Sequence, residues 1–172
     1  MNKLKIAYIT SEKKNDLKHW SGSSYNIYKC LKKSENQVTW YSTSNPLIYK
    51  LLFFLEKIFS LFGFNYDRSR SIFVSKFYAK KIKKILKNSD FDCIFVHQCS
   101  LVSFLEVDIP VYIWTDLTYD LFYKDYLKHK NSLSINNGNY LDKLALKRAK
   151  KIFYTSTYAK ENAIKNYKID SK

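Results

Sequence analysis

The chain has 172 residues, of which 46% are hydrophobic and 17% aromatic, and this composition excludes a disordered or fibrous protein. Its length suits one domain with a substantial core. The formal net charge is +15, because thirty Lys and Arg face fifteen Asp and Glu. This charge predicts an anionic partner such as a nucleic acid, an acidic membrane or a phosphorylated substrate, although a general lysine-rich bias would explain it equally well.

Cysteines and histidines point to no metal site. Cys30, Cys93 and Cys99 form no C-x-x-C motif, and two of them lie in apolar sequence, which is typical of reduced thiols in a cytoplasmic protein. The three histidines lack zinc spacing, so no metal is expected. The first residues, MNKLKIAYITSEKK, contain too few apolar residues for a secretory signal, and we therefore expect a cytoplasmic protein.

Apolar strand patterns alternate with helical patterns along the whole chain. Strands are predicted at Lys5–Thr10, Gln37–Tyr41, Asp92–His97, Val111–Thr115 and Lys151–Thr155. Helices are predicted at Ser23–Lys33, from Pro46 to near Gly63, and at Ile72–Lys87, Leu117–Lys128, Asn139–Ala149 and Thr157–Tyr167, with polar loops at Asn15–Ser21 and Asn131–Gly138. This order predicts a single α/β domain over residues 1–172, with a doubly wound, Rossmann-like parallel sheet.

The helix that begins at Pro46 is apolar around most of its circumference. Lys50, Glu56 and Lys57 interrupt the apolar run, and the uninterrupted part is too short to span a membrane. We expect this helix to pack against the sheet with its narrow polar stripe outward. A helix lying in the interface of a bilayer is the alternative.

The helix at Ile72–Lys87 is amphipathic and strongly basic. Val74, Tyr78, Ile82 and Ile85 share one face, and lysines cover the other. The lysines are Lys76, Lys80, Lys83, Lys84 and Lys87. Such a face is usually only solvated, but its concentrated charge would also suit an anionic surface.

Polar residues follow several of the predicted strands. Because the carboxyl ends of parallel strands meet at one edge of a sheet, we expect Gly22, His97, Asp116 and Ser156 to line one crevice. The turn around Gly22 opens a helix, where unpaired backbone N–H groups favour anions. Each residue also has a simpler explanation, since Asp116 and Ser156 suit helix caps and His97 suits a structural hydrogen bond.

Four segments carry a family resemblance. They are KIAYIT with HWSGSSYNIYKCLKK, then FDCIFVHQCS, then IPVYIWTDLTYD, and finally YLDKLALKRAKKIFYTSTYAKENAIKNY. In this order and spacing the chain resembles the N-terminal, acceptor-side domain of the family-four glycosyltransferases, which have the two-domain GT-B fold. The resemblance implies transfer of a hexose-type sugar from a nucleotide sugar to a hydroxyl of a glycan or lipid-linked acceptor, with retention of configuration and no metal.

The resemblance also implies roles for individual residues. Asp116 would be catalytic, orienting the acceptor hydroxyl or stabilising positive charge on the sugar, with support from His97. Gly22, Ser21 and Ser23 would approach the diphosphate of the donor or the acceptor. His19, Trp20 and Ser156 would form the acceptor pocket. The five lysines of Ile72–Lys87, with the Phe-rich helix before them, would contact an anionic membrane, as in relatives that act on lipid-linked acceptors; the protein would then sit on the inner face of the membrane.

The family binds its donor mainly through a second domain, and no residue here can be assigned to that domain's basic pair or acidic motif. We therefore expect no sugar transfer by the 172-residue chain alone, and a separate C-terminal domain as a partner. A non-catalytic Rossmann-like binding or partner domain is the alternative. A nucleic-acid partner is not expected, because most aromatics fall within strands and helix faces and no nucleic-acid motif occurs.

Overall fold

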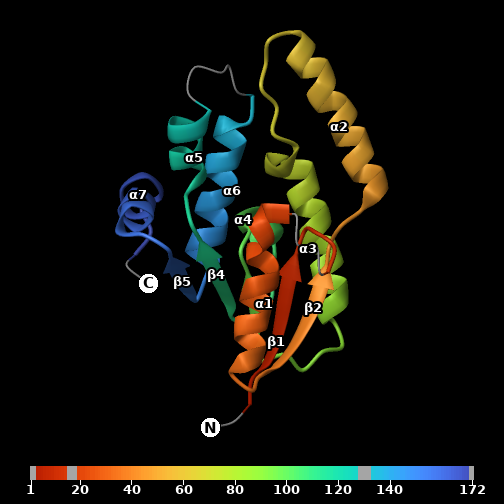
Figure 1. Cartoon of the computed structure of the whole chain (residues 1–172), viewed down its shortest axis with the longest axis vertical. Coiled ribbons are helices and arrows are strands. Elements are labelled where there is room, and N and C mark those ends of the chain that lie inside the picture. The colour runs from red at the N-terminus through yellow and green to blue at the C-terminus, as the bar shows by residue number, and fades with distance from the viewer. Residues whose placement is uncertain (1–2, 15–18, 128–132, 171–172) are drawn as a thin grey trace.

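The computed structural model describes residues 3–14, 19–127 and 133–170, and contains a five-stranded sheet in the order β2-β1-β3-β4-β5 (Figure 1). All neighbouring strands run parallel. The strands are β1 (Lys5–Thr10), β2 (Gln37–Ser42), β3 (Cys93–Val96), β4 (Val111–Thr115) and β5 (Lys151–Tyr154). With helices flanking this sheet, the protein has a Rossmann-like α/β fold, as the alternating sequence pattern predicts.

The helices are α1 (Ser23–Lys33), α2 (Pro46–Leu61), α3 (Ile72–Leu86), α4 (Cys99–Val102), α5 (Tyr119–Tyr126), α6 (Ile135–Arg148) and α7 (Thr157–Tyr167). Two short 3₁₀ segments, η1 (His19–Gly22) and η2 (Arg68–Arg70), and the single turn of α4 were not predicted. Residues 15–18 of the predicted first loop, and residues 128 and 131–132 in the region between α5 and α6, lie outside the described residues.

Helix α6 begins at Ile135, inside a segment predicted as a turn. Asn and Gly residues favour turns locally, but tertiary packing overrides this preference here. A Cβ at Gly138 would overlap the ring of Tyr119, which is completely buried. Gly138 is therefore needed for the close approach of α6 to α5, and not as a helix breaker.

One face of the sheet carries the main core. Register and alternation put Ala7, Ile9, Ile94 and Val96 on the same face, and all four are buried. They belong to one cluster with buried residues of α3, α4 and α6, namely Val74, Tyr78, Ile82, Leu101, Val102, Ala145 and Leu146. The opposite face carries aromatic side chains, where Tyr8 stacks on Tyr28 of α1 with ring centroids 6.3 Å apart.

Helix α2 stands apart from the sheet on the outer side of α3 (Figure 1). Of its residues only Leu52 is buried, while Leu47 is 78% exposed and Leu61 85% exposed. The expectation that this helix packs against the sheet is therefore wrong. Its start is well defined, because Asn45 Oδ1 accepts hydrogen bonds from the Leu47 and Ile48 amides at 3.1 and 3.3 Å. Over the described residues, no helix combines the length and apolarity that crossing a membrane requires.

Helix α3 confirms the predicted amphipathic pattern. Val74, Tyr78 and Ile82 are buried, and Ile85 is half-buried. The five lysines predicted on the opposite face, Lys76, Lys80, Lys83, Lys84 and Lys87, are all exposed.

Candidate functional site

A cavity of about 320 Å³ lies at the carboxyl edge of the sheet. It brings together three of the predicted site residues, Trp20, His97 and Asp116, from segments far apart in the chain. The predicted residues Gly22, Ser21, Ser23 and Ser156 are not among those that line it. The side chain of His19 lies outside the described part of the structure.

Asp116 directly follows β4 and is exposed at this cavity. Its Oδ1 accepts a hydrogen bond from the Leu117 amide at 2.9 Å. It does not cap the following helix, because Thr118 is the N-cap of α5 and its Oγ1 accepts from the Leu121 amide at 3.3 Å. Thr118 therefore fills the capping role that was the simpler explanation for Asp116, and Asp116 is left as an exposed residue that lines the cavity.

Two roles were predicted for Ser156, a helix cap and a part of the acceptor pocket, and the structure shows the helix cap. Ser156 is the N-cap of α7, and its Oγ accepts a hydrogen bond from the Ala159 amide at 3.2 Å. This bond satisfies one of the amides that a helix leaves unpaired at its start.

His97 lines the cavity with 1% of its side chain exposed, and its ring nitrogens lie near three buried groups. Nδ1 is 3.2 Å from the Tyr8 hydroxyl, which donates to the Ser24 carbonyl at 3.0 Å. Nε2 is 3.2 Å from Ser24 Oγ and 3.2 Å from a Glu12 carboxylate oxygen, and Ser24 Oγ donates to Glu12. His97 therefore belongs to one buried polar cluster with Tyr8, Ser24 and Glu12.

Glu12 is the buried partner of His97, and it is not among the site residues predicted from the sequence. Burial by itself would raise the pKa of Glu12, but the hydrogen bond and charge of His97, with a further hydrogen bond from Ser24, lower it to about 2. The pair ties the end of β1 to the end of β3 and the start of α1. No local motif marks Glu12, since it precedes its partner by 85 residues.

Trp20 forms the wall of the cavity above His97. The two rings are stacked with centroids 4.6 Å apart, and Trp114 meets the indole edge-on at 5.4 Å. Trp20 and Ser21 have φ of 50° and 52° and Gly22 has φ of 75°, so the turn before α1 is left-handed. Only glycine adopts this conformation without cost, and strain of this kind at non-glycine residues often accompanies function.

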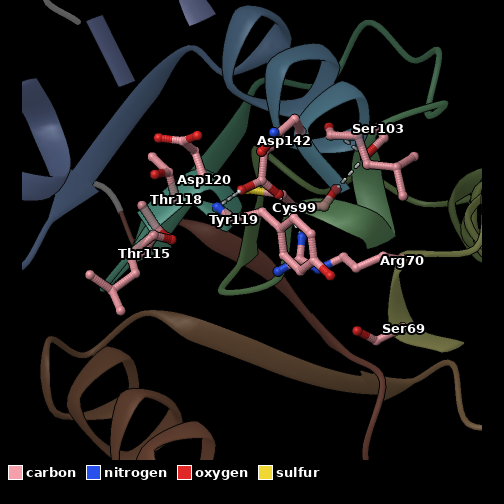
Figure 2. A network of polar contacts seen from close by, with 12 residues as sticks. Ser69, Arg70, Cys99, Ser103, Thr115, Thr118, Tyr119, Asp120 and Asp142 are labelled. Atoms are coloured by element: carbon pink, nitrogen blue, oxygen red, sulfur yellow. Dashed lines mark hydrogen bonds and ion pairs between the residues drawn. The ribbon is translucent and has the colours of Figure 1, made fainter. Parts of the chain in front are cut away.

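The ion pair between Arg70 and Asp142 also lines the cavity, and Figure 2 shows both residues with Tyr119. Arg70 Nη1 donates to Asp142 Oδ1 at 2.6 Å, and the Tyr119 amide donates to Asp142 Oδ2 at 2.7 Å. The guanidinium lies 4.5 Å from the centre of the Tyr119 ring. Beside it, burial and the nearby Asp142 carboxylate raise the pKa of the Cys99 thiol, so Cys99 is a core residue rather than a nucleophile.

Gln98 also lines the cavity. Its Oε1 is buried and has no hydrogen-bond partner among the described residues. A buried acceptor without a partner costs about 1–3 kcal/mol. The described residues contain no group of three or more His, Cys, Asp or Glu side chains placed to hold a metal ion.

Comparison with known proteins adds no family to this description. The chain matches no protein-family model, and no curated protein matches its sequence significantly. The resemblance to family-four glycosyltransferases therefore stays a hypothesis that depends on the residues themselves.

Proposed function

We propose that the cavity around Asp116 binds the hydroxyl-bearing acceptor of a retaining glycosyltransferase, and that this chain is the acceptor-side domain of such an enzyme. The observation that carries the proposal is the convergence of Trp20, Gln98 and the exposed Asp116, from three separate segments, in one cavity at the carboxyl edge of the sheet. Ligands bind at this edge in parallel α/β folds.

The chemistry of the cavity suits a polyol. Asp116 would accept a hydrogen bond from the attacking hydroxyl and stabilise positive charge on the sugar ring in the transition state. Trp20 offers an aromatic face that the buried His97 ring holds in place, with ring centroids 4.6 Å apart. The nucleotide sugar would be a co-substrate held mainly by a separate domain, as the resemblance implies, so transfer would require both domains.

Chemical-shift mapping with neutral di- and trisaccharides tests this proposal on the ¹⁵N-labelled chain. We expect shifts at the amides of Trp20, Gln98 and Leu117, and about a tenfold weaker affinity in Asp116→Asn, because a hydrogen bond to a charged group contributes about 1.5–3 kcal/mol. UDP-glucose at the same concentration should produce no shifts at these amides. Binding of UDP-glucose without any saccharide binding would show that the acceptor role is wrong.

A non-catalytic binding or partner domain is the alternative function. A partner domain would leave the cavity amides unchanged with every saccharide in the same titration. A non-catalytic binding domain would show the shifts but give no sugar transfer when combined with a donor domain.

We further propose that the protein associates with an anionic membrane through α2 and the basic face of α3. The exposed apolar residues of α2 favour this over simple solvation; they include Leu47, Leu51, Phe54 and Leu61. The five exposed lysines of α3 would each add on the order of 1 kcal/mol near an anionic surface.

A further inference from the structure

The cavity around Asp116 has two neighbours. It shares the wall residues Trp20, Ser69, Arg70, Gln98 and Phe122 with a second cavity of about 400 Å³. That second cavity shares Ser11, Asn45, Tyr49 and Arg68 with a third of about 520 Å³. The three cavities therefore lie in a row from the end of β4 to the base of α2, and we refer to them together as the long groove.

The chemical character of the long groove changes along its length. The first cavity is lined by three carboxylates, those of Asp67, Asp116 and Asp142, and by Arg70, which pairs with Asp142. Among the described residues that line the second cavity there is no Asp or Glu, and its charged groups are Arg68 and Arg70. Its other lining residues are largely apolar and include Ile48, Leu52, Val74 and Phe77.

Both arginines of the second cavity are held in fixed orientations. Arg68 Nη1 donates to Glu56 at 2.8 Å, and its guanidinium lies 4.2 Å from the centre of the Tyr49 ring. Arg70 is held in the same way by Asp142 and the Tyr119 ring. Each ion pair uses one nitrogen and each ring covers one face, so further N–H donors remain at the edge of the planar group. Two such pre-oriented guanidinium groups suit the oxygens of a phosphate.

The third cavity leads from the arginines to apolar surface. It is lined by Pro46, Tyr49 and Phe53 of α2, with Lys13 and Lys50 beside them. Phe53 is 49% exposed, so the groove opens onto the exposed apolar residues of α2.

We propose that the long groove binds an anionic amphiphile in which a phosphate joins a hydroxylated head group to a hydrocarbon chain. The head group would meet Asp116 and Gln98, the phosphate would lie between Arg68 and Arg70, and the chain would run over Ile48 and Leu52 toward α2. This inference rests on the proposed function, because the head group is the acceptor of the proposed transfer.

Calorimetric titration of the 172-residue chain with monomeric n-decyl phosphate tests the inference, with n-decyl glucoside and inorganic phosphate as comparison probes. We expect decyl phosphate to bind at least tenfold more tightly than decyl glucoside and a hundredfold more tightly than inorganic phosphate. Lengthening the chain from octyl to decyl should raise affinity about threefold per methylene group. Equal affinity for decyl phosphate and inorganic phosphate would overturn the inference, because the apolar part of the groove would then contribute nothing.

The variant Glu56→Gln/Arg68→Gln removes the Arg68 cation together with its partner and leaves the net charge unchanged. We expect it to lose at least tenfold in affinity for decyl phosphate and to bind decyl glucoside as before. Arg68→Lys keeps the charge but not the planar fork and should lose about threefold. Lys160→Gln, on exposed α7, lowers the net charge by one and should bind within twofold of the unsubstituted chain. Unchanged binding by a folded Glu56→Gln/Arg68→Gln variant would refute the inference.

Three further outcomes separate the sources of phosphate and the two proposals. Binding to phosphatidylglycerol vesicles without binding to monomeric decyl phosphate would mean that headgroups are held at the surface, and the groove proposal would be wrong. Saccharide shifts at the Asp116 cavity without decyl phosphate binding would leave the acceptor function standing alone. Decyl phosphate binding without saccharide shifts would support the groove and remove the acceptor function.

Discussion

Trp20 lies face to face on the buried ring of His97, with ring centroids 4.6 Å apart and planes 14° apart. His97 Nε2 is in turn 3.2 Å from a carboxylate oxygen of the buried Glu12, so the contact joins a cavity wall to a polar pair inside the fold. The position of Trp20 therefore depends on contacts inside the fold as well as on the cavity itself.

Replacing Trp20 with Ala should weaken saccharide binding at the Asp116 cavity by about two- to tenfold, since aromatic contacts contribute about 0.5–1.5 kcal/mol beyond area burial. Chemical-shift titration measures the change. Tyr158→Ala, which removes an aromatic ring 54% exposed on α7, serves as the control and should bind normally. Equal affinity in Trp20→Ala would mean that the indole is only structural.

Glu12→Gln should lower the free energy of unfolding at pH 7 by about 3 kcal/mol, because it removes a buried carboxylate that accepts a hydrogen bond from Ser24 and lies 3.2 Å from His97 Nε2. Urea unfolding followed by circular dichroism measures this change. Glu161→Gln, at an exposed position on α7, should change stability by less than about 0.5 kcal/mol.

The same carboxylate predicts a pH dependence. The folded pKa of Glu12 is about 2 and its ordinary value is 4.5, so its stabilising contribution is complete above about pH 4.5 and is lost as the pH falls toward 2. The lowered pKa corresponds to at most about 3 kcal/mol. The unfolding curves of the unsubstituted chain and Glu12→Gln should therefore converge between pH 4.5 and 2, and a constant difference over that range would contradict the assignment.

Asp116→Asn should leave the fold intact, with a stability change within about 0.5 kcal/mol, because the side chain is exposed and its amide replacement still accepts from Leu117. In a transferase that contains this domain with a donor domain, kcat should fall about 10²–10⁴-fold. Asp125→Asn, exposed on α5, is the matched control. Turnover unaffected by Asp116→Asn would exclude a chemical role for this carboxylate.

Gly138→Ala should destabilise the protein by about 1–3 kcal/mol, because the new methyl group overlaps the Tyr119 ring. In an exposed helix the same change would stabilise by up to about 1 kcal/mol. Asn136→Ala, exposed on the same helix, is the comparison. Thermal unfolding shows whether Gly138→Ala stabilises or destabilises the protein. A higher melting temperature in Gly138→Ala would show that Tyr119 can move aside.

Vesicle sedimentation tests the membrane proposal. The chain should bind phosphatidylglycerol vesicles more strongly than phosphatidylcholine vesicles, and added salt should weaken this binding because the attraction is electrostatic. Leu47→Ser/Phe54→Ser, at residues 78% and 62% exposed, should reduce binding without destabilising the fold. Leu133→Ser, exposed outside α2, is the control. Equal binding to both kinds of vesicle would contradict a role of the α3 lysines in membrane binding.

The sequence by itself determined the strands to within one residue at each end, because apolar runs bounded by polar turns are a local signal. It also brought His97 and Asp116 to one edge, since parallel strands share their carboxyl ends. The buried face of α3 followed from helical spacing for the same local reason.

Only the tertiary structure decided which distant side chains meet. Glu12 pairs with His97 across 85 residues and Arg70 with Asp142 across 72, and no local pattern encodes either contact. The tertiary structure also decided that most of α2 stays exposed. The apolar composition of this helix could not show that, because a helix buried in the core has the same composition. Periodicity depends on neighbours along the chain, whereas partners, caps and exposed faces depend on how the finished elements pack.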